Sequence, residues 1–278
     1  MLAGCIVHPD HKEVLPIAPE AIIKQDGAKK NDCERNACKR MLSDFRREHP
    51  HLDVIVVEDA LSANTPHIKL LRSLKCNFIL GVKPGDHAHL FDAIDNTAEY
   101  GLSQWHTSAE KGLVRRFQFI NNVPLTAGDD TVRINFLRFW EIDKDGVTRE
   151  FSWVTDYELS KSNVEKIMRG GRARWKIENE TFNTLKNQGY QFEHNFGHGN
   201  RNLSVNFAMI MMLAFLIDQV QALCCKAFQR AQAKRINKKS FWEKMRSIIF
   251  DLPLQGWGQL WDAIAFGFRV TEFSIDTT

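Results

Sequence analysis

A strand–helix–strand pattern in the first third of the chain most limits the folds available to it. Residues 54–57 read Val-Ile-Val-Val, a β-branched run typical of a strand buried on both faces. A helix is expected at about residues 62–74, followed by a second apolar strand at residues 77–82. Two strands joined by a helix of this length form a parallel crossover unit. The sequence therefore predicts an α/β fold.

An acidic pair, Glu58 and Asp59, follows the first of these strands directly. In open α/β sheets, ligands gather at the carboxyl ends of the strands, where Asp59 is expected to lie. A carboxylate at that edge suits a hard cation such as Mg²⁺. An aspartate after a strand also serves as a helix cap or turn residue, and the pattern alone favours that simpler interpretation.

A polar stripe is predicted further along, in a helix at residues 174–186. Arg174, Glu178, Phe182 and Lys186 recur every four residues, so in a helix they share one face. A carboxylate between two cations suits a polyanion and its metal ion. A surface helix laced with salt bridges has the same pattern and is the commoner case. The second carboxylate, Asp59, is what favours the metal-binding interpretation.

The sequence between and after these motifs divides into a β-rich stretch and a helical half. Three segments that alternate polar and apolar residues predict a small antiparallel sheet inserted into the first domain: residues 113–121, 132–142 and 148–154. From about residue 161 the chain is expected to be helical. Gly170 and Gly171 are expected to break the helix, since two glycines cost roughly 2 kcal/mol in a helix interior. The apolar run at residues 207–217 is too short to span a bilayer and predicts a buried core helix.

Cysteine usage favours a cytosolic protein. The six cysteines form no Cys-x-x-Cys pair and no disulfide-like spacing, and no signal peptide is recognised, so reduced thiols are expected. A net charge of +3 is too small to indicate a nucleic-acid partner by itself. Residues 226–246, however, hold eight Lys or Arg and one acid. Such a run is usually a solvated helical face, but it can also hold phosphates.

Several short sequence motifs together resemble those of a known family. They are residues 58–61 (Glu-Asp-Ala-Leu), residues 79–87 (Ile-Leu-Gly-Val-Lys-Pro-Gly-Asp-His) and residues 174–178 (Arg-Trp-Lys-Ile-Glu), supported by residues 30–37 and 193–199. The chain resembles bacterial insertion-sequence transposases of the DDE type, in the group with a β-rich insertion before the last carboxylate. The resemblance covers roughly residues 1–223.

The resemblance implies a ribonuclease H-like fold in which two aspartates and a glutamate bind Mg²⁺, or Mn²⁺ as a substitute, to cut and join DNA. Asp59 matches the second aspartate and Glu178 the glutamate. Arg174 and Lys186 are expected to contact phosphate. A tryptophan at the place of Trp153 stacks on a flipped base in related enzymes, although core packing is the commoner role of any one tryptophan.

The sequence departs from the family pattern in two places. In the family's Tyr-x2-Arg-x3-Glu-x6-Lys signature, the tyrosine position falls on Gly171 and the lysine position on Leu185, with Lys186 one residue late. No position matches the first aspartate, and neither Asp10 nor Asp26 is a convincing substitute. We therefore expect an N-terminally truncated transposase that lacks the first strand of its core and is impaired or inactive.

The predicted organisation has four parts. They are the truncated start of the ribonuclease H-like core (residues 1–84), the β-rich insertion (85–157), the helical completion of the core with Glu178 (158–224) and a basic helical tail (225–278). The expected partner is double-stranded DNA at transposon ends, bound by a homodimer in the cytoplasm at the nucleoid, without a membrane.

Two other functions remain open at this point. The first is a non-catalytic DNA-binding remnant, or an inhibitor that pairs with intact transposase. The second is a metal-dependent nuclease with a rearranged site, in which Asp10, Asp26, Asp32 or Glu58 supplies the third carboxylate. The two functions differ in whether a third acid lies beside Asp59.

Overall fold

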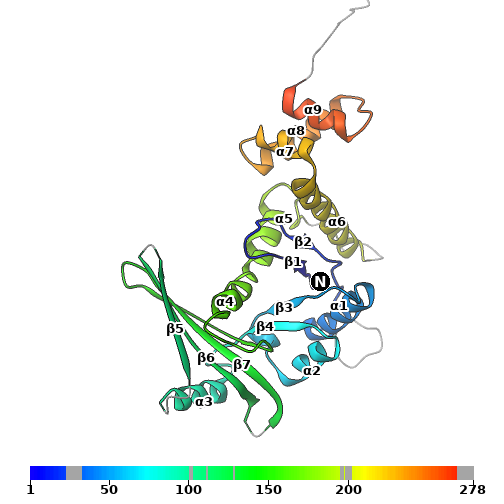
Figure 1. The fold of residues 1–278 in the computed structure, drawn as a ribbon. Coiled ribbons are helices and arrows are strands. Elements are labelled where there is room, and N and C mark those ends of the chain that lie inside the picture. The colour runs from blue at the N-terminus through cyan, green and yellow to red at the C-terminus, as the bar shows by residue number, and fades with distance from the viewer. Residues whose placement is uncertain are drawn as a thin grey trace, which may run out of the picture. The chain divides into compact units, whose positions relative to one another are not determined.

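The computed structural model describes residues 1–22, 33–99, 103–110, 112–127, 129–194, 197 and 202–267 (Figure 1). The chain divides into two units. The sheet unit contains residues 8–10 and 22–175. The helical unit contains residues 1–7, 11–21 and 176–278. Asp26 and Asp32 lie outside the described residues, as do parts of the 30–37 and 193–199 motifs.

The sheet unit is built on one six-stranded sheet with the order β3-β4-β8-β7-β6-β5. Its strands are β3 (Ile55–Glu58), β4 (Asn77–Gly81), β5 (Gln104–Glu110), β6 (Leu113–Thr126), β7 (Asp129–Ile142) and β8 (Thr148–Thr155). The pair β3–β4 is parallel, which confirms the predicted crossover, and the other pairs are antiparallel. The inserted strands do not form a sheet of their own, because β8 pairs with β4 and continues the first sheet.

Helices accompany this sheet in the described part of the unit. They are α1 (Glu34–Glu48), the 3₁₀ turn η1 (Ala60–Ser62), α2 (Thr65–Ser73), α3 (Ala88–Glu99) and α4 (Val164–Arg172). Helix α3 was not predicted, although Leu90, Phe91 and Ile94 follow helical spacing and are buried. Strand β5 was also missed, since its sequence is mostly polar and most of its residues are exposed at the edge of the sheet.

The prediction that Gly170 and Gly171 break the chain's helical course is wrong, since both lie inside α4. A Cβ at Gly171 would lie 2.5 Å from Trp153 Nε1, and one at Gly170 would lie 2.9 Å from Ile79 Cδ1. The glycines therefore let α4 approach the sheet closely. The helix joins a buried cluster with strand residues, namely Ile79, Phe117, Phe119, Leu137, Phe139, Trp153, Leu159, Val164, Ile167 and Met168. Burial of each large apolar side chain contributes about 1.5–3 kcal/mol, so packing outweighs the helix cost of two glycines.

The helical unit begins with a short hairpin and continues with helices. Its elements are β1 (Cys5–Ile6), β2 (Leu15–Pro16), the π-helical segment η2 (Ile177–Phe182), α5 (Asn183–Asn187), α6 (Leu203–Cys224), α7 (Lys226–Ala233), α8 (Lys238–Asp251) and α9 (Trp257–Phe266). Strands β1 and β2 pair antiparallel and form the hairpin. The predicted single helix at residues 174–186 is wrong in detail, because a turn and the π-helical segment interrupt it before α5.

Helix α6 differs from the predicted buried core helix. It spans 22 residues, and only 17% of its most apolar window is buried. Met212, Phe215 and Gln219 are buried on one side, while Ile210 and Leu213 are exposed. Among the described residues, α6 is one helix that is long and apolar enough to cross a membrane by length and composition.

The basic C-terminal region has an apolar core of its own. Helices α7, α8 and α9 share a buried cluster that includes Phe228, Phe241, Trp242 and Trp261. Helix α8 begins with a capping box, in which the side chains of Asn237 and Ser240 each accept from the other residue's backbone N–H. The basic stretch is therefore part of a packed group of helices.

Candidate functional site

Asp59 lies immediately after β3 and caps the 3₁₀ turn η1. Its Oδ1 accepts a hydrogen bond from Leu61 N at 3.1 Å, so the simpler interpretation of this aspartate as a cap is confirmed. The residue is exposed, and within the described ranges no hydrogen bond reaches its Oδ2. A cap that uses one carboxylate oxygen leaves the other for a cation, so capping and metal binding are compatible.

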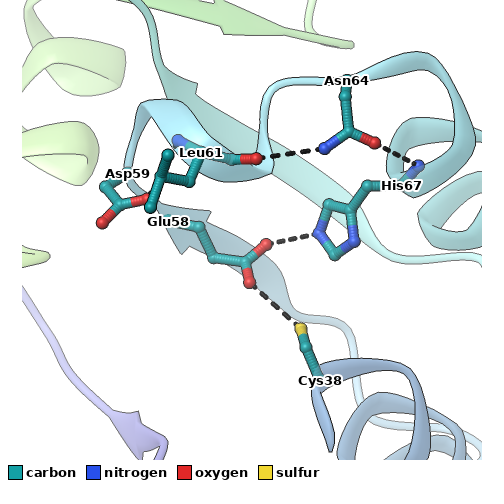
Figure 2. A network of polar contacts seen from close by, with 6 residues as sticks. All are labelled: Cys38, Glu58, Asp59, Leu61, Asn64 and His67. Carbon is teal, nitrogen blue, oxygen red and sulfur yellow. Dashed lines mark hydrogen bonds and ion pairs between the residues drawn. The ribbon is translucent and has the colours of Figure 1, made fainter. Parts of the chain in front are cut away.

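Glu58 points away from Asp59, toward helices α1 and α2 (Figure 2). Its Oε1 accepts from Cys38 Sγ at 3.2 Å, and its Oε2 accepts from His67 Nε2 at 2.5 Å. The opposite directions follow from the alternation of side chains along a strand. Burial and the charge of Glu58 raise the pKa of the Cys38 thiol, which therefore stays protonated and donates to the carboxylate.

The turn that carries Asp59 is tied to helix α2 by Asn64. The Asn64 side chain donates to Leu61 O at 3.1 Å and accepts from His67 N at 3.1 Å (Figure 2). His67 in turn contacts Glu58, so two connections run from α2 to the residues beside Asp59. The backbone that presents the Asp59 carboxylate is thus held from both sides.

Glu178 lies in the π-helical segment of the helical unit. It is exposed and lines an open pocket together with Phe182, Asn183, Lys186 and Phe192. Glu178, Phe182 and Lys186 therefore share a face, as predicted, although the helix that carries them is irregular. Insertions of π-helix into a helical course are frequent at functional sites.

A match to a protein-family model identifies the family of this chain. Residues 10–216 match the model of a family described as transposase DDE domain. The chain belongs to this transposase family. The matched range includes Asp59 and Glu178. No curated protein matches the chain.

Family membership gives this transposase domain a substrate class and a type of cofactor. Transposases act on DNA, and the DDE family normally uses divalent metal ions. Asp59 and Glu178 are each an exposed carboxylate, the kind of group that Mg²⁺ takes together with water and phosphate oxygens. Asp59 belongs to the sheet unit and Glu178 to the helical unit, and their joint action stays a prediction.

The two predicted phosphate ligands lie in different surroundings. Arg174 is half-buried in the turn that follows α4. Lys186 Nζ lies 2.8 Å from Glu193 Oε1 in an exposed ion pair, which DNA phosphate would have to displace. Trp175, next to Arg174, was not singled out from the sequence, yet it is 56% exposed and offers an aromatic surface.

Trp153 is a core residue in this conformation of the transposase domain. It is 6% exposed, stacks on Phe151 at 6.0 Å between ring centroids, and packs on Gly171. Base stacking by Trp153 requires the ring to leave these contacts. The predicted stacking role therefore depends on a movement of α4 or β8.

The possible substitutes for the first aspartate that the structure describes, Asp10 and Glu58, have other partners. Asp10 forms an ion pair with Arg169 of α4. Glu58 is held by Cys38 and His67 on the other side of the strand end.

Proposed function

We propose that this chain is a DNA transposase domain that uses Mg²⁺, or Mn²⁺ as a substitute, for phosphodiester hydrolysis and strand transfer at transposon ends. The observation that supports this proposal most directly is the position of Asp59 in a chain that belongs to the transposase DDE family. Asp59 is an exposed carboxylate at the carboxyl end of a strand in a parallel pair, with one oxygen in a cap. This is where open α/β sheets bind ligands.

In the proposed site, Asp59 and Glu178 hold the metal. Bound Mg²⁺ supplies positive charge that activates an attacking hydroxyl and stabilises the leaving oxygen. Arg174 and Lys186 orient the DNA by its phosphates, which fix position without reading sequence. Trp153 stacks on a base once the substrate is bound.

We further propose the context in which this chemistry takes place. The pair β3–β4 belongs to a ribonuclease H-like core, and double-stranded transposon ends are bound by a homodimer in the cytoplasm at the nucleoid. The exposed cations of α7 and α8 add affinity for DNA that weakens as salt rises, because each phosphate contact releases a counterion.

The chain is also proposed to be impaired as an enzyme. The family uses three carboxylates, and only Asp59 and Glu178 match their positions. Asp10 and Glu58 already have partners of opposite charge or hydrogen-bonding partners. Two ligands hold Mg²⁺ less firmly than three, so turnover is expected to be weak.

A DNA-binding remnant, or an inhibitor of intact transposase, is the second candidate function. The observation that favours it is the C-terminal group of helices, α7 to α9, which packs around its own apolar cluster and carries the basic residues of 226–246. Neither Asp59 nor Glu178 belongs to this group. DNA binding can therefore persist when cleavage is lost.

Cleavage of a labelled DNA duplex in Mg²⁺ or Mn²⁺ tests the proposal. We expect weak cleavage that is lost in Asp59→Ala and in Glu178→Ala. Asp145→Ala is the matched control, since Asp145 is exposed in the turn between β7 and β8. Cleavage that survives both active-site changes overturns the proposed site.

Two other results would refine the proposal. Rapid turnover that Asp59→Ala abolishes would keep the site and refute the impairment. Binding with a steep salt dependence and no cleavage in either metal would favour the DNA-binding remnant.

A further inference from the structure

Three potential metal ligands converge in the sheet unit beside the strand end that carries Asp59. Cys38 comes from α1, Glu58 from the end of β3 and His67 from α2. One ligand atom from each lies within 4.8 Å of the other two. We propose that Cys38, Glu58 and His67 form a zinc site, separate from the carboxylates of the DNA-cleaving site.

The distances between the donor atoms suit a zinc ion after a small movement. In a tetrahedral site with Zn–S of about 2.3 Å and Zn–N or Zn–O of about 2.0–2.1 Å, neighbouring ligand atoms are roughly 3.3–3.6 Å apart. Cys38 Sγ and Glu58 Oε1 are 3.2 Å apart, close to that spacing. His67 Nε2 and Glu58 Oε2 are 2.5 Å apart and must separate by about 1 Å, within reach of a side-chain rotation of Glu58.

The chemistry of the three donors selects the class of ion. A thiolate and an imidazole favour Zn²⁺ and similar borderline-soft ions, whereas Mg²⁺ requires oxygen ligands. Zinc would replace the thiol proton of Cys38, which leaves to solvent. Neutral His67 would bind through the Nε2 lone pair, with its ring proton on Nδ1 instead of Nε2. The cluster would then hold one carboxylate and one thiolate against an ion of charge +2, which balances the charge inside the protein.

Burial of the cluster favours a retained ion with one open position. Cys38 and His67 are each 8% exposed, and the side chain of Glu58 is 22% exposed. Glu58 is the most exposed of the three, and a water molecule beside it can supply the fourth ligand. Three protein ligands with one water is a common arrangement at zinc sites that are not closed.

A bound ion would join three separate secondary-structure elements. Cys38 is 20 residues and His67 is 9 residues from Glu58. Zinc would tie α1, β3 and α2 together and stabilise the sheet unit, since an ion that binds only the folded state raises its stability. Without an ion, Cys38 and His67 each form a hydrogen bond with Glu58. The experiment must distinguish this hydrogen-bonded cluster from a zinc-bound one.

Cobalt provides the test, because Co²⁺ takes the place of Zn²⁺ and reports thiolate coordination by its absorption spectrum. The full chain is reduced, dialysed against a chelator and titrated with Co²⁺. We expect one equivalent to produce a thiolate-to-cobalt band and the strong visible bands of a tetrahedral ion. Added Zn²⁺ should remove these bands, and excess Mg²⁺ should leave them unchanged.

Variants assign the bands to the cluster. Cys38→Ala and His67→Gln should lose the thiolate band or weaken Co²⁺ binding at least tenfold, a loss of roughly the size that even outer-shell changes cause. Cys33→Ala is the matched control, since Cys33 is exposed just before α1. Asp59→Ala should keep the band, so the outcome is independent of the proposed transposase site.

Folding of each variant is followed by circular dichroism, and the thermal midpoint is measured with and without Zn²⁺. Zinc should raise the midpoint of the parent chain and of Cys33→Ala by several degrees, and not that of a folded Cys38→Ala. A folded parent chain without a thiolate band overturns the proposal, as does an unchanged band in Cys38→Ala. If Cys38→Ala does not fold, Glu58→Gln is tested in its place. A folded Glu58→Gln variant with undiminished Co²⁺ affinity would also overturn the proposed zinc site.

Discussion

Gly171 of α4 lies directly against the indole of Trp153, so closely that a Cβ at position 171 would be 2.5 Å from Nε1. We predict that Gly171→Ala destabilises the sheet unit by about 1–3 kcal/mol, because overpacking outweighs the gain of about 1 kcal/mol in helix propensity. Urea unfolding followed by circular dichroism measures the change. Gly258→Ala is the matched control, since Gly258 lies in helix α9 with open space around it. That control should be neutral or stabilising, and a stabilised Gly171→Ala would contradict the close contact.

The His67 side chain is predicted to position Asp59 through Glu58. Truncation to alanine leaves the partly buried Glu58 carboxylate without its 2.5 Å partner, at a cost of about 1–3 kcal/mol. We expect His67→Ala to speed hydrogen exchange in residues 55–64 as well as to lower stability. His51→Ala, at an exposed histidine before β3, should change neither quantity. Unchanged exchange around Asp59 would show that the contact does not position it.

Asp218 gives the helical unit a predicted pH dependence. Its Oδ2 accepts from Tyr190 Oη at 2.5 Å, and burial raises the pKa of Asp218 from 3.8 to about 6, against the opposing effects of Tyr190 and Lys238. A raised pKa in the folded state means that the stability from protonated Asp218 is present below about pH 4. That stability is lost as the pH rises through about 6, by up to about 3 kcal/mol at 1.36 kcal/mol per unit.

The variant Asp218→Asn checks this sign. Its free energy of unfolding, relative to that of the parent chain, should improve steadily from pH 4 to pH 7, because asparagine has no charge to bury. Chemical unfolding at several pH values measures the difference. Asp262→Asn is the control, since Asp262 is exposed and 3.9 Å from Arg230. A difference that stays constant with pH would contradict the raised pKa.

The elements with strong local signals were predictable from the sequence. The β-branched run of β3 and the alternation along β6, β7 and β8 identified those strands, because side-chain period reflects which faces are buried. The pairing of β8 with β4 was not predictable, since period does not state which strands are neighbours. The helical path through Gly170 and Gly171 depends on contacts with Ile79 and Trp153, which lie far away in sequence.

In the candidate site, too, features with a local sequence signal were predictable and contacts between separate elements were not. Short motifs made Asp59 and Glu178 candidates, and the cap formed by Asp59 follows from its place after a strand. The contact of Glu58 with Cys38 and His67 left no local signal, because the three residues come from separate elements. The π-helical segment around Glu178 also escaped prediction, since four-residue spacing in a sequence is compatible with a regular helix.

The cations of α7 and α8 are predicted to determine how DNA affinity depends on salt. Lys234 and Lys239 are exposed, in the turn after α7 and in the first turn of α8. Each phosphate contact contributes about 0.9 to the slope of log K against log salt, so Lys234→Ala and Lys239→Ala should each reduce the slope by about 1. Fluorescence anisotropy with a labelled duplex at several salt concentrations measures this slope. Lys161→Ala, at an exposed lysine of the sheet unit, should leave it unchanged. Equal slopes in all of these variants would place the DNA on another surface, since a lysine that releases no counterion does not touch phosphate.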